Sequence, residues 1–223
     1  EGSKVFLESL SLWSELKKYT ESIKLIKVFD RHKLNKILFH NPNRNEKLGY
    51  VIENSRFSKV LRDKIQKKKN VRNFYGSSIL KIEIEKELSK TYIKNQIISS
   101  KLIIAADGKN SNTREIFGTK IFSKKYKESA FVVNFLHEKT TNNTAYEIFY
   151  NNGPLAILPM KSTNNHNQSS IIWSNEDSLV KSLINCNNKF LEYYIYERVG
   201  DITGKIKKIN SKQTFPLSAH INE

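Results

Sequence analysis

The hydrophobic positions near the N-terminus follow the spacing of an amphipathic helix over residues 4–19. Apolar side chains recur every three or four residues from Val5 to Leu16, with Lys and Glu between them. A second stripe of this kind runs from Phe57 to Ile65, behind Asn54, which offers a helix N-cap. A third helix is expected over residues 178–196.

Alternating or continuous apolar runs predict strands in most of the remaining chain. Residues 79–84 and 92–97 alternate with a period of two, so each has one apolar face. A strand is also expected over residues 101–106, where the continuous apolar run Leu102 to Ala106 is typical of a strand buried on both faces. Asn151-Asn152-Gly153 is a strong hairpin signal. Further strands are expected over residues 23–30, 34–39, 131–135, 145–150, 155–160, 170–173 and 205–217. The pattern therefore predicts a mixed α/β (α+β) fold with two sheet systems that alternate along the sequence.

The composition is that of a folded protein, since 38% of the 223 residues are hydrophobic and 11% are aromatic. No apolar run approaches the roughly 20 residues that span a bilayer, and the first residues do not resemble a signal peptide. The lone cysteine, Cys186, cannot form an internal disulfide, which fits a reducing compartment or simple indifference to redox. We expect a cytoplasmic location.

The net charge of +16 raises the question of an anionic partner. The Lys residues are spread along the chain, and no recognition helix, zinc-finger spacing or RNA-binding aromatic motif accompanies them. A nucleic-acid partner is therefore not expected. Loose attraction to an acidic membrane surface, such as the inner membrane, stays open, because scattered Lys still adds to that attraction.

The segment from Ile103 to Arg114 joins an apolar strand, an Asp-Gly turn and the start of a helix. Gly108 lets the main chain bend or approach a ligand closely. The helix start offers free N–H groups to an anion such as a pyrophosphate, and Arg114 adds a planar cation. Asp-Gly turns are common, so this segment alone is a modest signal.

This segment resembles the internal Asp-Gly motif of the group A flavoprotein hydroxylases, the p-hydroxybenzoate hydroxylase-like enzymes. Asp107, Gly108, Ser111 and Arg114 occupy the marked positions of that motif. Further blocks, in family order, resemble the ubiquinone-biosynthesis hydroxylases of the UbiH/UbiF type. These blocks are Leu48 to Asn54, Thr144 to Phe149, Gly153 to Pro159, Ile172 to Ser174 and Phe215 to Leu217.

The resemblance implies an oxidoreductase: a FAD-dependent monooxygenase that hydroxylates an aromatic ring of a ubiquinone precursor with NAD(P)H and O2. It implies an incomplete Rossmann-like FAD-binding domain interleaved with a mostly antiparallel β-sheet substrate domain flanked by helices. The implied partners are a polyprenylated aromatic substrate and, as an open alternative, a membrane surface or other proteins of ubiquinone synthesis. The resemblance implies a FAD-binding domain that includes residues 1–20 and 48–118 and a substrate-binding domain of residues 21–47 and 119–212. Residues 213–223 would start the return of the chain to the FAD-binding domain.

The resemblance also implies the site residues. Asn54, Asp107, Gly108, Ser111 and Arg114 would contact FAD, and Phe149, Leu155 and Ile157 would line the substrate pocket. Each has a structural alternative, because Asp107 could only cap its own turn and the apolar residues could be plain core. No catalytic residue or metal ligand is expected, because the flavin supplies the chemistry and no His pair has helical spacing.

The family also binds FAD with an N-terminal Gly-x-Gly-x-x-Gly turn and a late Gly-Asp motif. This sequence has no Gly-x-Gly-x-x-Gly arrangement, and it stops at Glu223, shortly after Phe215 to Leu217, where the late motif would be approaching. We therefore expect a piece cut at both ends that holds FAD weakly and is inactive alone. Two other functions stay open. One is a related flavin hydroxylase of another aromatic compound, and the other is a non-catalytic basic binding module derived from this fold.

Overall fold

The computed structural model describes residues 2–30, 36–43, 46–163 and 166–222. Its residues form two compact units, one of residues 1–65 and 126–217 and the other of residues 66–125 and 218–223. Each unit is described by itself below.

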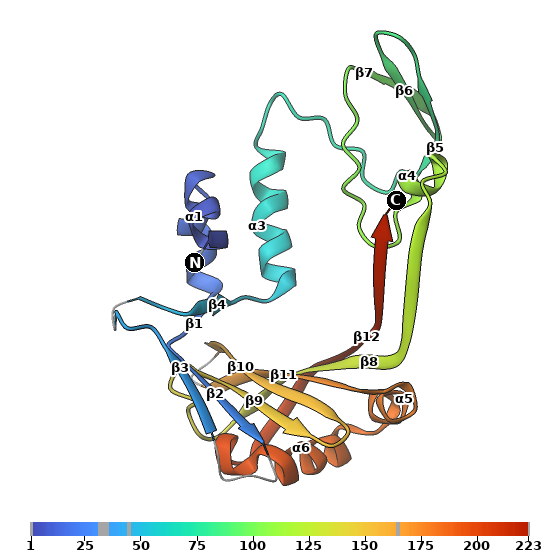
Figure 1. Ribbon diagram of the computed structural model, residues 1–223. Coiled ribbons are helices and arrows are strands. Elements are labelled where there is room, and N and C mark those ends of the chain that lie inside the picture. Colours follow the sequence, from blue (N-terminus) through green and yellow to red (C-terminus); the bar gives the residue numbers. More distant parts are fainter. Residues whose placement is uncertain (1, 31–35, 44–45, 164–165, 223) are drawn as a thin grey trace. The chain divides into compact units, whose positions relative to one another are not determined.

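The larger unit is built on a seven-stranded sheet with the order β12-β8-β11-β10-β9-β2-β3 (Figure 1). The pairs β2–β3, β9–β10, β10–β11 and β8–β11 are antiparallel, whereas β2 and β9 are parallel. Strands β1 (Glu21–Ile23) and β4 (Gly49–Val51) form a separate antiparallel pair. The sheet strands are β2 (Leu25–Asp30), β3 (Lys36–His40), β8 (Ile121–His137), β9 (Thr144–Tyr150), β10 (Gly153–Thr163), β11 (His166–Glu176) and β12 (Ile206–Asn222).

The predicted hairpin at Asn151-Asn152-Gly153 joins β9 to β10, with Gly153 opposite Tyr150. Gly153 has a φ of +116°, which L side chains rarely adopt. A Cβ at this position would also lie 2.0 Å from the carbonyl oxygen of Ser174 on β11. Both constraints require glycine here, so the hairpin and its packing against β11 depend on the same residue.

Helices α5 (Asp177–Asn185) and α6 (Asn188–Thr203) cover one face of this sheet (Figure 1). The sequence predicts one helix here, but the chain breaks at Cys186 and restarts where the Asn187 side chain accepts a hydrogen bond from the Phe190 N–H. The core between these helices and the sheet is Phe131, Val133, Phe135, Ile148, Leu155, Ile157, Ile171, Trp173, Val180, Leu183, Leu191, Ile195, Val199 and Ile209.

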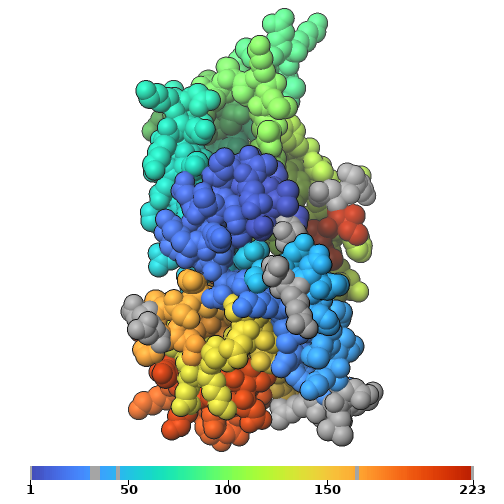
Figure 2. All heavy atoms as spheres, turned by 90° about the vertical axis from the view of Figure 1, so that its left-hand side faces the viewer, coloured from blue at the N-terminus to red at the C-terminus, as the bar shows by residue number. Residues whose placement is uncertain are grey.

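The N-terminal helix that the sequence predicts is interrupted. It consists of α1 (Gly2–Ser9), α2 (Trp13–Leu16) and the short 3-10 turn Lys17–Tyr19. The break falls at Ser11, which has a φ of +55°. Leu12 and Leu16 pack against Val60 of α3 (Asn54–Gln66), and the Lys64 ammonium lies 3.1 Å from the Glu15 carboxylate. Figure 2 shows the dark-blue N-terminal residues as one continuous surface.

The smaller unit contains the antiparallel sheet β5-β6-β7 and the short helix α4 (Asn112–Ile116). Its strands are β5 (Ile79–Ile84), β6 (Ser89–Ile93) and β7 (Gln96–Ser100). The single strand predicted over residues 92–97 is therefore wrong, because Lys94 and Asn95 form a turn between β6 and β7.

The buried strand predicted over residues 101–106 is also wrong. This segment has no regular secondary structure, and Leu102 and Ile104 are 73% and 80% exposed. A strand is buried on both faces only when neighbouring strands and helices cover it. Nothing within the described part of the smaller unit covers these two side chains to that extent.

The mixed α/β class and the mostly antiparallel character of the large sheet are confirmed. The compact units divide the chain at other points than the domains implied by the resemblance, since residues 1–20 and 48–65 pack in the unit that holds the large sheet. The FAD-binding and substrate-binding ranges stay a prediction.

Candidate functional site

The Asp-Gly turn of the smaller unit is closed by hydrogen bonds to the Asp107 carboxylate. Oδ1 accepts from the Ser111 hydroxyl at 2.6 Å, and Oδ2 accepts from the Thr113 N–H at 2.9 Å. The Ser111 oxygen in turn accepts from the Arg114 N–H at 3.0 Å, as the N-cap of α4. These bonds, with Ser111 contributing most, hold the pKa of Asp107 well below its usual range. Asp107 is therefore an ionised residue that organises its own turn.

A hollow of about 520 Å³ opens beside this turn. Gly108 has a φ of +81°, and a Cβ there would meet nothing within 4 Å, so the space in front of its main chain is open. The Arg114 side chain donates to the Lys109 carbonyl oxygen at 2.8 Å, which holds its guanidinium near the turn. The hollow is lined by Ala105, Ala106, Asp107, Gly108, Ser111, Thr113, Arg114, Phe117 and Thr119.

The chemistry of this hollow fits part of a dinucleotide such as FAD. Exposed main chain and a fixed guanidinium suit phosphate and hydroxyl groups. The apolar side chains of Ala105, Ala106 and Phe117 suit the uncharged part of such a ligand. The carboxylate of Asp107 already has two donors within the chain, so it shapes the turn more than it offers a free acceptor.

A second cavity, of about 310 Å³, lies in the larger unit where α3 begins. Glu53 precedes the helix, and its carbonyl oxygen accepts from the Arg56 and Phe57 N–H groups. Its carboxylate accepts from the Gln168 side chain at 3.2 Å. The Arg56 guanidinium lies 5.6 Å from the centre of the Tyr19 ring. The cavity is lined by Tyr19, Val51, Ile52, Glu53, Arg56, Met160, Lys161, Ser162, Thr163, Gln168 and Asn210.

This cavity is within the size range of small-molecule sites. It combines an aromatic ring, a carboxylate, a guanidinium and the Gln168 amide, so it could orient a polar aromatic compound. Asn54 is the first residue of α3 and is exposed, and the cavity is lined by its neighbour Glu53 and not by Asn54 itself.

The predicted pocket residues lie elsewhere. Leu155 and Ile157 are 1% and 0% exposed and belong to the core beneath α5 and α6, whereas Phe149 is 50% exposed. The structure thus brings Asp107, Gly108, Ser111 and Arg114 together in one turn. It places Asn54 and the predicted pocket residues in the other unit.

Sequence reasoning missed Tyr19, Glu53, Arg56, Met160 and Gln168 as cavity residues. The bond between Glu53 and Gln168 joins residues 115 positions apart, and Tyr19 is contributed by a third segment. The one available signal was the block Leu48 to Asn54, which contains three of the lining residues but gives no indication of their partners.

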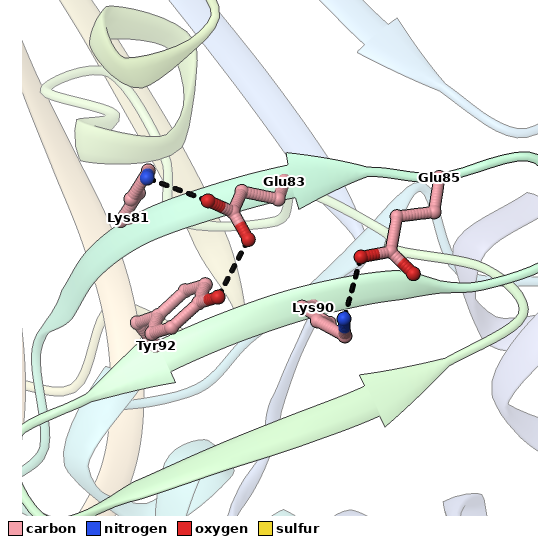
Figure 3. A network of polar contacts seen from close by, with 5 residues as sticks. All are labelled: Lys81, Glu83, Glu85, Lys90 and Tyr92. Atoms are coloured by element: carbon pink, nitrogen blue, oxygen red, sulfur yellow. Dashed lines mark hydrogen bonds and ion pairs between the residues drawn. The ribbon is translucent and has the colours of Figure 1, made fainter.

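A further cluster of titratable groups lies on the β5–β6 hairpin (Figure 3). The Glu83 carboxylate pairs with the Lys81 ammonium and accepts from the Tyr92 hydroxyl, both at 2.5 Å. The hydrogen bond to Lys81 lowers the pKa of Glu83, and the bond to Glu83 raises the pKa of Tyr92. Lys90 and Glu85 pair beside them. These groups are exposed or half-buried at the surface, so water and salt screen them.

Solved structures establish what this fold resembles. The chain superposes with a TM-score of 0.73 on PqsL, a probable FAD-dependent monooxygenase from Pseudomonas aeruginosa, at 11% identity, covering 95% of this chain and 60% of that one. It superposes with a TM-score of 0.61 on CmlS, a flavin-dependent halogenase, at 11% identity, covering 99% of this chain and 40% of that one. The fold is that of FAD-dependent monooxygenases and related flavoenzymes.

Curated relatives show which flavoenzymes the sequence resembles. The chain is 24% identical to ubiquinone hydroxylase UbiL of Rhodospirillum rubrum over 95% of its length and 49% of that protein. It is 26% identical to the human mitochondrial ubiquinone biosynthesis monooxygenase COQ6, over 86% of its length and 42% of that protein. No protein-family model matches. The predicted resemblance to ubiquinone-biosynthesis hydroxylases is confirmed, and the chain spans about half the length of the curated relatives it matches.

None of the helices in the described part of the chain is long and apolar enough to cross a bilayer. Within that same part, no group of three or more His, Cys, Asp or Glu side chains could hold a metal ion. His32, one of the five histidines of the sequence, lies outside the described residues.

Proposed function

We propose that this chain is part of a FAD-dependent monooxygenase that hydroxylates an aromatic ring of a ubiquinone precursor with NAD(P)H and O2. The observation that carries the proposal is the match to ubiquinone hydroxylases along nearly the whole chain. The flavoenzyme fold supports it independently. The substrate would be a polyprenylated aromatic compound.

In this proposal the Asp-Gly turn holds FAD. The main chain at Gly108 and the guanidinium of Arg114 would contact its phosphate and hydroxyl groups, while Asp107 and Ser111 keep the turn closed. Asn54 would contribute from the start of α3. FAD, when bound, supplies the oxygen-transfer chemistry, and the protein positions the ring and excludes water.

We propose the cavity beside Glu53 and Arg56 as a place for a polar group of the substrate. Phe149 is exposed enough to contact a ligand, whereas Leu155 and Ile157 would support the sheet from its core side. A cytoplasmic protein with peripheral attraction to the inner membrane fits the charge of +16. Contacts with other proteins of ubiquinone synthesis belong to the same proposal.

The whole reading frame that contains this chain provides the test. Its product, purified with FAD, is expected to oxidise NAD(P)H faster when a prenylated phenol is added, and to restore quinone synthesis in a hydroxylase-deficient strain. Stimulation by another aromatic compound without rescue would favour a related hydroxylase. If no aromatic compound stimulates NAD(P)H oxidation, the enzyme proposal fails and a non-catalytic binding module replaces it.

The 223 residues alone are expected to bind FAD weakly. Their 8 glycines form no Gly-x-Gly-x-x-Gly cradle, so the pyrophosphate would lack its strongest anchoring contacts. The measurement is flavin absorbance of the chain after incubation with FAD and gel filtration. A stoichiometric yellow complex would contradict this prediction.

A further inference from the structure

Glu147 is a carboxylate in the middle of an apolar sheet face. Tyr146 and Ile148, its neighbours on β9, pack against the core beneath α5 and α6. Because successive side chains on a strand point to opposite faces, Glu147 lies on the face turned away from those helices.

The strand register places Glu147 in a row that crosses the sheet. It pairs with Val28 on β2 and with Ala156 on β10. Ala156 pairs with Ile172 on β11, which pairs with Val132 on β8. These five residues are all half-buried, and only Glu147 is polar. The strands that carry the row are adjacent in Figure 1.

The Glu147 carboxylate has no compensating partner among the residues that the structure describes. Burial alone raises its pKa, with no contribution from a hydrogen bond or a neighbouring charge. Among the residues that the structure describes, Asp30, which pairs with Phe149 one row further along β9, is the nearest charged group on this face by register. An apolar, half-buried setting disfavours a charged group, and such groups concentrate at functional sites.

Small residues flank this carboxylate. Ala156 lies beside Glu147, and Ala145 lies two positions before it on the same face of β9. Ala156 is half-buried and adds little bulk beside the carboxylate, whereas Ala145 is 4% exposed and already covered. Val28 and Ile172 offer apolar contact at the edges of a flat ring placed over Ala156. A ring seated there would bring a ring substituent within reach of the carboxylate, which is an acceptor only.

We propose that Glu147 is a substrate-binding residue that accepts a hydrogen bond from a free hydroxyl of the aromatic ring. This inference rests on the proposed function and makes it more specific, because the substrate would be a phenol and neither its O-methyl ether nor a quinone. A ring without the hydroxyl leaves the carboxylate partnerless in an apolar setting, which is how a polar site rejects such a compound.

The test uses the FAD-loaded product of the whole reading frame, with 2-prenylphenol and its O-methyl ether as probes. Binding is followed by the change in flavin fluorescence. The unaltered protein is expected to bind the phenol about ten-fold or more tightly than the ether, since hydrogen bonds to charged groups are the stronger ones. Glu147→Gln should remove most of this preference, and Glu147→Ala all of it.

The control is Glu197→Gln, a change of an exposed carboxylate on α6 that should leave both affinities unaltered. Glu147→Gln should keep its FAD content and thermal midpoint, because it removes a charge that burial disfavours. If the unaltered protein prefers the phenol and Glu147→Gln prefers it equally, the inference about Glu147 is overturned and the proposed function stands. If the unaltered protein binds neither probe and shows no aromatic-stimulated NAD(P)H oxidation, both fall.

Discussion

Replacing Leu155 with alanine is expected to lower the free energy of unfolding by about 2–5 kcal/mol. Leu155 is 1% exposed, and it lines a small internal void with Trp173 of β11 and Leu191 of α6. Truncation removes apolar contacts and enlarges this void, which the surrounding sheet and helices can close only in part.

Urea unfolding of the chain, followed by the fluorescence of its two tryptophans, measures this loss. The matched control is Phe149→Ala, because both residues are predicted pocket residues. Phe149 is 50% exposed, so its truncation should cost well under the value for Leu155. Equal losses in the two variants would show that Leu155 does not lie in a close-packed core. If Leu155→Ala instead loses little free energy of unfolding but much substrate affinity, Leu155 belongs to the substrate pocket.

The features predicted correctly from the sequence are those that neighbouring residues determine. The hairpin at Asn151-Asn152-Gly153 follows from the turn chemistry, and the start of α4 follows from Ser111, whose side chain caps it. The Asp-Gly turn is largely local, since the hydrogen bonds of Asp107, Ser111 and Arg114 that close it join residues between 107 and 114. One further bond is not local, because the Asn112 amide donates to the Ile79 carbonyl oxygen on β5 at 2.8 Å. The candidate FAD turn can therefore be predicted from the residues of the turn themselves.

The predictions that fail or stay untested concern features that depend on contacts between segments far apart in the sequence. The apolar run 101–106 reads as a buried strand, but burial depends on neighbours that its own sequence cannot specify. Leu155 and Ile157 are apolar on a strand, and only the position of α5 and α6 decides whether their face is core or pocket. The cavity beside Glu53 and Arg56 needs residues from at least four separate segments. No periodicity in one segment predicts such a cavity.

The same reasoning explains why Glu147 was not singled out from the sequence. On β9 alone, Glu147 alternates with Tyr146 and Ile148 as a polar residue on the exposed face of a strand would. The register with Val28 and Ala156 changes this interpretation, because it places the carboxylate between apolar neighbours on both sides. A solvated Glu and a candidate binding residue therefore look alike in the pattern of one strand. Only the residues paired with the Glu on neighbouring strands distinguish them.

Replacing Asp107 with alanine is expected to weaken the binding of FAD to the whole protein. The affinity should fall by about ten-fold for each turn residue that is no longer ordered and that FAD binding must then order. The carboxylate holds Ser111 and the Thr113 N–H, so its loss removes both bonds that close the turn. Gly108 and Arg114 are still present in this variant, but without these bonds the turn no longer holds them in a fixed position for FAD. Titration of the apoprotein with FAD, followed by flavin fluorescence, gives the affinity.

The pH dependence separates this structural role from a direct contact. Asp107 has a folded-state pKa below its unfolded value, so its contribution to stability is present above the unfolded pKa and is lost only as pH falls through the folded one. The turn should therefore stay closed near pH 4, where an ordinary aspartate is about half protonated. Asp201→Ala, on α6 in the other unit, is the matched control and should leave FAD affinity unaltered. Asp107→Asn keeps an acceptor for the Thr113 N–H and should retain part of the affinity. If Asp107→Ala binds FAD as tightly as the unaltered protein, the Asp-Gly turn does not hold the cofactor.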